Sequence, residues 1–153
     1  MFFDLALVFD PETRLCDLAL DDDCDLQIDE TSITPMLMTV GLDRRAAPDD
    51  ELPEGRSRFL APVSYSERRG CPGDALDPLG DLTGVRTWLL DRAKETETTR
   101  QLFRFWLEEG FAWTQRELGS AALIETEWQE GARLAYRCQI DDASLTLSRR
   151  LDV

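Results

Sequence analysis

The side chains that could do chemistry in this sequence are mainly carboxylates, and no histidine accompanies them. The 153 residues include 31 Asp and Glu, 17 Lys and Arg, and no His. Without histidine the chain cannot form a Ser-His-Asp triad, a Cys-His pair, an HExxH zinc site or a His-ligated iron site. Neither GxxxxGKS/T nor GxGxxG occurs, so both familiar phosphate-binding loops are missing as well. The sequence therefore favours a protein that is not an enzyme.

The carboxylates themselves lack the spacing of a metal or catalytic site. The acidic run at 21–25 looks like the start of a calcium loop, but an EF-hand beginning there needs Gly and Glu where this chain has Leu26 and Ser32. Neighbouring acids such as Glu108 and Glu109 are expected to be solvated charges opposite an apolar helix face. We predict no metal and no cofactor.

The overall charge restricts the partners. A formal net charge of −14 repels the phosphate backbone, so nucleic acid is not expected to bind. No uninterrupted apolar run approaches 18 residues, and the start of the chain, MFFDLALVFD, has acids where a signal peptide needs bases. We expect synthesis in the cytoplasm and no membrane association. The length and the 42% of hydrophobic residues suit one folded domain over residues 1–153.

Periodicity predicts the elements that must position these side chains in the N-terminal half. Apolar residues alternate over 3–9 and 14–20 around a turn at 10–13, which predicts a β-hairpin. Thr31 or Ser32 can cap a short helix that ends near Gly41. Residues 43–81 contain many Pro and Gly and show no period, so they form a long ordered loop. Loops of this length in a compact domain are usually functional.

The C-terminal half reads as helices followed by a meander. We predict a helix over 82–94 and a longer one over 98–118, whose two apolar rows would pack at the centre of the fold. Alternating segments at 122–129, 133–140 and 144–151 predict three antiparallel strands separated by short turns. The fold class is therefore α+β, with helices packed on an antiparallel sheet that the strands from both ends of the chain are expected to share.

Three segments taken together resemble a known family. They are Gly41-Leu42-Asp43-Arg44-Arg45-Ala46-Ala47-Pro48-Asp49-Asp50-Glu51-Leu52-Pro53, then Gly84-Val85-Arg86-Thr87-Trp88-Leu89-Leu90-Asp91-Arg92-Ala93-Lys94, then the helix and strands through Ile140. Their order and spacing, over about residues 3–140, resemble the small baseplate wedge protein of Mu-like phages. The chain departs from that family at Gly70-Cys71-Pro72-Gly73-Asp74, where members carry two aromatic residues.

The resemblance implies a structural role in a contractile tail. It implies a sheath-initiating component of the virion baseplate, assembled in the bacterial cytoplasm, that docks on the large wedge subunits and offers strands to the tail sheath protein. It also implies a ring of six copies. Cys71, beside Pro72 and Gly73, is the candidate for a disulfide to a neighbouring subunit, because a virion leaves the reducing cytosol.

Two sets of residues offer a route for these contacts. Arg44 and Arg45, with Asp49 and Asp50, lie on the long loop, where the arginines can pair with carboxylates of a partner or with acids of their own chain. The last strand carries a polar face and a basic end, and at a sheet edge it could accept a partner strand. These residues are Ser144, Thr146, Ser148, Arg149 and Arg150. If that strand is internal, the N-terminal hairpin is the alternative.

Two other functions stay open at this point. A cell-wall muramidase would need one carboxylic acid with a raised pKa in an apolar cleft, and nothing in the sequence marks such an acid. An acidic adaptor could instead mimic nucleic acid for basic partners.

Overall fold

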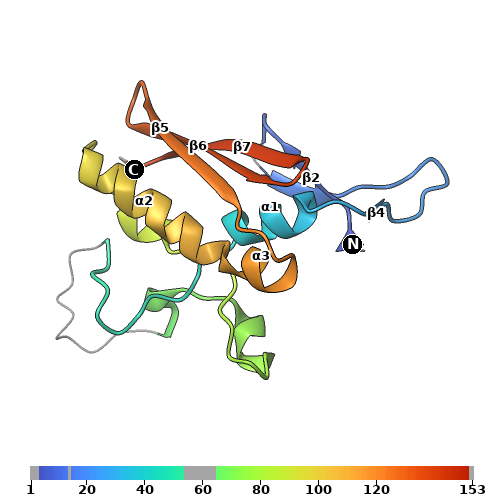
Figure 1. The fold of residues 1–153 in the computed structure, drawn as a ribbon, viewed down its shortest axis with the longest axis horizontal. Coiled ribbons are helices and arrows are strands. Elements are labelled where there is room, and N and C mark those ends of the chain that lie inside the picture. The colour runs from blue at the N-terminus through green and yellow to red at the C-terminus, as the bar shows by residue number, and fades with distance from the viewer. Residues whose placement is uncertain (1–3, 14, 54–64, 152–153) are drawn as a thin grey trace.

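The computed structural model describes residues 4–13, 15–53 and 65–151, and it is an α+β fold (Figure 1). The helices are α1 (Ile33–Gly41), α2 (Glu97–Gly110) and α3 (Ala112–Glu117), with 3-10 turns η1 (Tyr65–Arg68), η2 (Pro72–Leu76) and η3 (Thr87–Leu90). The strands are β1 (Asp4–Leu5), β2 (Leu7–Asp10), β3 (Leu15–Leu18), β4 (Ile28–Asp29), β5 (Leu123–Gln129), β6 (Arg133–Ile140) and β7 (Ala143–Arg150). None of the helices in these residues has the length and apolar character to span a bilayer.

The C-terminal meander is confirmed. Strands β5, β6 and β7 form an antiparallel sheet in that order, so β6 is central and β5 and β7 are its edges. Alternation along β6 buries one side of the sheet. The buried side chains are those predicted to point inward, namely Leu134, Tyr136, Cys138 and Ile140.

Helix α2 packs on that buried face and forms the centre of the structure. Phe103 and Leu107 lie one turn apart and are almost completely buried, together with Phe111 just after the helix. A second, smaller cluster of Trp88, Leu89 and Ala46 packs against Trp106 of the same helix. In Figure 1 the sheet lies on one side of α2, and the described loop residues 43–53 and 65–81 lie on the other. The predicted central helix thus holds two layers together.

The single helix predicted over 98–118 is wrong in one respect, because it is broken into α2 and α3. Gly110 ends α2, and the backbone N–H of Phe111 bonds back to the carbonyl oxygens of Leu107 and Glu109. A Cβ at position 110 would collide with the Val85 side chain. The break lets α2 approach the 84–85 segment closely and then redirects the chain into α3.

The helix predicted over 82–94 is also wrong, since only η3 is helical there. Val85 instead pairs in parallel with Asp43, through bonds from Val85 N to Leu42 O and from Arg44 N to Val85 O, each 3.0 Å. Gly84 has a φ of +87°, and a Cβ on it would overlap the Leu42 carbonyl. The apolar spacing fits a helix, but backbone pairing with the long loop decides the conformation.

The predicted N-terminal hairpin is confirmed as β2 and β3, joined by the turn after Asp10. The expectation that it shares one sheet with the C-terminal strands is wrong: β2 pairs with β3, and β1 with β4, in two separate two-stranded sheets. The hairpin reaches the body through α1, where the N–H of Leu7 donates to the Thr34 hydroxyl. Asp29 also accepts hydrogen bonds from the Thr34 N–H and the Thr31 hydroxyl. Burial raises the pKa of Asp29, but these hydrogen bonds outweigh it, so the pKa is lowered.

The 84–42 contact gives a stability prediction. Gly84→Ala adds both a left-handed strain of about 1–2 kcal/mol and a steric overlap, so it is expected to lower the free energy of unfolding by more than strain alone. Gly119→Ala has the same kind of φ, +76°, with nothing within 4 Å, and isolates the strain. Urea unfolding of both variants measures the difference; equal losses would show that the close approach is unimportant.

Candidate functional site

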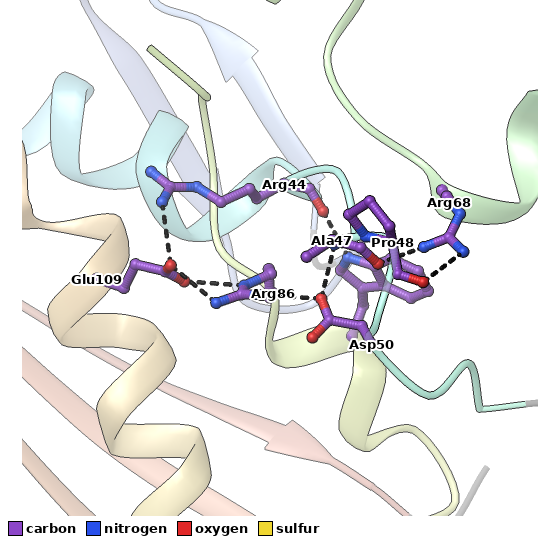
Figure 2. Close-up of polar contacts among 8 residues, drawn as sticks. Arg44, Ala47, Pro48, Asp50, Arg68, Arg86 and Glu109 are labelled. Carbon is purple, nitrogen blue, oxygen red and sulfur yellow. Dashed lines mark hydrogen bonds and ion pairs between the residues drawn. The ribbon is translucent and has the colours of Figure 1, made fainter. Parts of the chain in front are cut away.

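The loop that carries the family-like Asp-Arg-Arg-Ala segment is held to α2 by one arginine. Figure 2 shows Arg86 between Asp50 and Glu109. Its Nε and Nη2 donate to the two oxygens of Glu109 at 2.9 and 2.8 Å, and its Nη1 donates to Asp50 at 2.8 Å. Only 15% of the Arg86 side chain is exposed. These bonds outweigh the effect of burial and raise the pKa of Arg86, so the group stays charged.

Arg44 points into the chain rather than toward a partner. Its Nη2 donates to the Leu82 carbonyl at 2.6 Å, and its Nη1 lies 3.9 Å from Glu109. Burial lowers the pKa of Arg44 while Glu109 opposes that shift. The buried Nε finds no acceptor among the described residues. Of the two readings of Arg44, pairing inside the chain is the one observed, although its carboxylate is Glu109 and not Asp43, Asp49 or Asp50.

The rest of the loop is pinned through its backbone. Asp50 accepts the N–H of Ala47 at 2.8 Å, and Arg68 donates to the carbonyls of Ala47 and Pro48 (Figure 2). The Arg45 Nη1 donates to the carbonyl of Arg69 at 3.2 Å. Of the predicted loop residues, Asp49 is the one whose side chain is exposed.

Trp88 connects this loop to a second group of charges. The Trp88 indole N–H donates to the Arg44 carbonyl at 2.8 Å, and the Arg69 guanidinium lies 4.5 Å from the Trp88 ring centroid. Arg69 also pairs with Asp43 at 2.5 Å and Asp91 at 3.6 Å. Aromatic and ionic contacts therefore fix the described parts of the long loop, 43–53 and 65–81; residues 54–64 of the predicted loop lie outside the described residues.

The predicted strand-addition residues lie on β7, at an edge of the meander. Ser144 and Thr146 are exposed on the face away from the core. Arg149 is not aimed at solvent, because its Nη2 donates to Asp91 at 2.9 Å and so ties the end of β7 to the loop layer. Ser148 and Arg150 follow on the outer face and are both engaged in further contacts.

A few carboxyl groups of the described residues have a shifted pKa. The described carboxyl groups whose pKa departs from its ordinary value are Asp10, Asp29 and Glu97, and each pKa is lowered. The hydrogen bond from Arg100 brings the pKa of Glu97 to about 2. No three metal-type ligands gather among the residues described. Burial raises the pKa of Cys138 to about 12, which leaves its thiol protonated.

The predicted disulfide candidate is half-buried. Cys71 precedes η2, whereas Cys16 and Cys24 in the N-terminal segment are exposed, and all three are free thiols. The glycine before it, Gly70, has a φ of +112° and packs against Arg45. The segment in which the chain departs from the aromatic pair of the family therefore lies next to Arg45.

Comparison with known proteins assigns the chain to a family. The model of the family described as phage protein GP46 matches residues 32–146. The chain belongs to this family. It is also 33% identical over 94 residues, 60% of its length, to "Baseplate protein gp46" of Escherichia phage Mu. The matched stretch spans 56% of that relative. No solved structure matches.

The family match covers the loop, α2 and most of the meander, so the resemblance to a Mu-like phage baseplate protein is confirmed. It leaves the segment before residue 32 outside. Arg86 and Asp91 belong to the second family-like segment, but the sequence does not predict their pairing roles. The sequence signal for the role of Arg86 is its place next to Thr87 and Trp88, both of which are buried. A charge flanked by core residues needs a partner.

The Arg86 contacts give a second prediction. Arg86→Met leaves Asp50 and Glu109 without their shared cation, and we expect a loss of about 2–3 kcal/mol in the free energy of unfolding. Arg104→Met is the matched control, because its pair with Glu108 joins side chains that are 50% and 47% exposed and should matter by less than about 0.5 kcal/mol. Urea unfolding followed by tryptophan fluorescence compares the two variants. Similar losses in the free energy of unfolding would show that the Arg86 contacts stabilise the fold no more than an exposed ion pair does.

Proposed function

We propose that this chain is a non-enzymatic structural component of a phage tail baseplate. The supporting observation is the family match over 32–146 together with the likeness to the Mu baseplate protein. The contacts agree with such a role, since Arg44, Arg68 and Arg86 hold the described part of the long loop in place and so preorganise its surface. A rigid, preorganised surface loses less entropy when a partner binds.

We further propose that the long loop docks on a large wedge subunit. Asp43, Arg44, Arg68 and Arg86 hold the loop from inside. The exposed Asp49 would then meet a basic group of the partner, so the docking charge is an acid. This differs from docking through Arg44, whose guanidinium is already occupied by Glu109 and Leu82.

The second contact that we propose is addition of a sheath strand at β7. An edge strand offers every second backbone N–H and C=O group to a neighbour. Within the described sheet β7 has β6 as its one hydrogen-bonded neighbour. The other edge, β5, is partly covered, because Arg100 of α2 donates to the Thr126 carbonyl at 3.1 Å. The start of β7, with exposed Ser144 and Thr146, is therefore the better acceptor.

The baseplate role is tested on tails. Mass spectrometry of purified tail particles should detect this chain, and co-expression with the large wedge subunit should yield a complex. Asp49→Lys should weaken that complex at least tenfold, a loss of about 1.4 kcal/mol, by placing like charges together. Asp142→Lys, an equal charge reversal at an exposed turn after β6, should not. Tails without the chain would contradict the role; equal binding by both variants would contradict docking at Asp49.

Strand addition is tested by amide hydrogen exchange on the complex with the sheath protein. Amides of Ala143–Leu147 that exchange in the free chain should become protected, because a new strand would accept their hydrogen bonds. Amides of β5 serve as the internal reference and should keep their rates. A complex that protects β5 or the N-terminal hairpin instead would place the sheath contact at another edge.

A further inference from the structure

The N-terminal segment before the family-matched region is built around a three-way strand junction. Three backbone bonds form a closed ring: Ala6 N to Gln27 O at 2.8 Å, Gln27 N to Ala19 O at 3.0 Å, and Ala19 N to Ala6 O at 3.0 Å. Three short antiparallel pairs extend from it, which are β1 with β4, β2 with β3, and the bridge between Leu20 and Leu26. We call residues 4–30 the arm.

One face of the arm is aliphatic. Side chains directly opposite in an antiparallel pair share a face, and so do residues two apart along a strand. The pairs are Leu5 with Ile28, Leu7 with Leu18, and Leu20 with Leu26. Each of these six residues directly precedes or follows one of the ring residues Ala6, Ala19 and Gln27. All six therefore lie on the same face around the ring.

This aliphatic face is not covered by the described residues. Leu20 is 62% exposed, Ile28 52%, Leu18 45%, Leu26 39% and Leu5 37%. Five large aliphatic side chains this open on one face of a short segment are unusual for a surface that faces water alone, because grouped apolar patches mark interaction sites. Leu7, the sixth, is half-buried where the arm meets α1.

Acids lie on the opposite face of the arm and in the turns at the edges of the aliphatic face. By the same alternation Asp4, Asp10 and Asp17 belong to the opposite face, and the turns add further carboxylates. Within the arm these acids are Asp4, Asp10, Glu12, Asp17, Asp21, Asp22, Asp23, Asp25, Asp29 and Glu30, against Arg14 as its single Lys or Arg. All but Asp29 are exposed.

We propose that the aliphatic face of the arm docks a different protein, one that presents aliphatic side chains bordered by Lys and Arg. The apolar contact supplies the affinity, and the acidic border selects a basic partner. A second copy of this chain is disfavoured as the occupant, because its own arm would bring the same acids against this one in a chain of net charge −14. The proposal rests on the proposed function only in taking the partner from the tail particle.

Cysteine labelling reads the aliphatic face directly. Cys16 pairs with Phe9 and so shares that face with Leu18, and its thiol is exposed. In a chain carrying Cys24→Ser and Cys71→Ser, maleimide reacts with Cys16, since Cys138 is buried. We expect Cys16 to react at least about tenfold more slowly in purified tails than in the isolated chain, because docking blocks access to the thiolate. Reaction at an equal rate in tails that contain the chain overturns the proposal and leaves the baseplate role standing.

A matched pair of variants tests the same surface by incorporation. Leu20→Gln with Ile28→Gln should lower the amount of chain in tails at least about tenfold, while the melting temperature stays that of the wild type, because both side chains are exposed in the free protein. Leu102→Gln with Leu123→Gln changes two aliphatic side chains that are 41% and 57% exposed on α2 and β5, outside the arm and the long loop, and should be incorporated normally. Equal incorporation of the two double variants overturns the proposal.

The remaining outcomes are also decisive. A stable dimer of the isolated chain in sedimentation, with Cys16 protected in it and released by Leu20→Lys, would make a second copy the occupant and overturn the proposal. Tails that lack the chain altogether would overturn both the docking surface and the baseplate role. Tails that contain the chain, protect Cys16 and reject the arm variant would support it.

Discussion

The charge of the Arg86 guanidinium is balanced from two directions, by Glu109 on α2 and by Asp50 on the long loop. A cation that is 15% exposed cannot be left unpaired, so the positions of helix and loop depend on each other. The Trp106 ring lies 5.8 Å from the same guanidinium and also contacts both hydrophobic clusters. Together with the contacts of Arg44, Arg68 and Arg69, this side chain fixes the described parts of the long loop, 43–53 and 65–81, which contain little regular secondary structure.

The close approach of the 84–85 segment to 42–44 makes that arrangement geometrically consistent. Gly84 leaves room for the Leu42 carbonyl, and Gly110 leaves room for the Val85 side chain, since a Cβ at either position would overlap these atoms. Two positions without a Cβ therefore let loop, strand-like segment and helix come together in one place. The Trp88 indole N–H then donates to the Arg44 carbonyl in the same place.

The body and the arm differ in how they are stabilised. The body buries Phe103, Leu107 and the inner face of β6 in a continuous core. The arm has little apolar burial of its own and is held mainly by backbone pairing around its junction. A part that folds against the body yet leaves its aliphatic face open is suited to contact another molecule, whereas the rigid body is suited to set the position of that contact.

The sequence alone determined the elements whose pattern is local. Period-two alternation determined the N-terminal hairpin and the meander of β5, β6 and β7, because side chains in a strand must alternate between core and solvent. The Asp-Arg-Arg-Ala and Arg-x-Trp-Leu-Leu segments determined the family. Tertiary structure alone decided that 82–94 is not a helix, that Gly110 breaks the central one, and that the two ends form separate sheets. It also decided that Arg44 and Asp50 face inward, since the partner of a charge and the close approach of two backbones are set by distances in space that spacing along the chain does not contain.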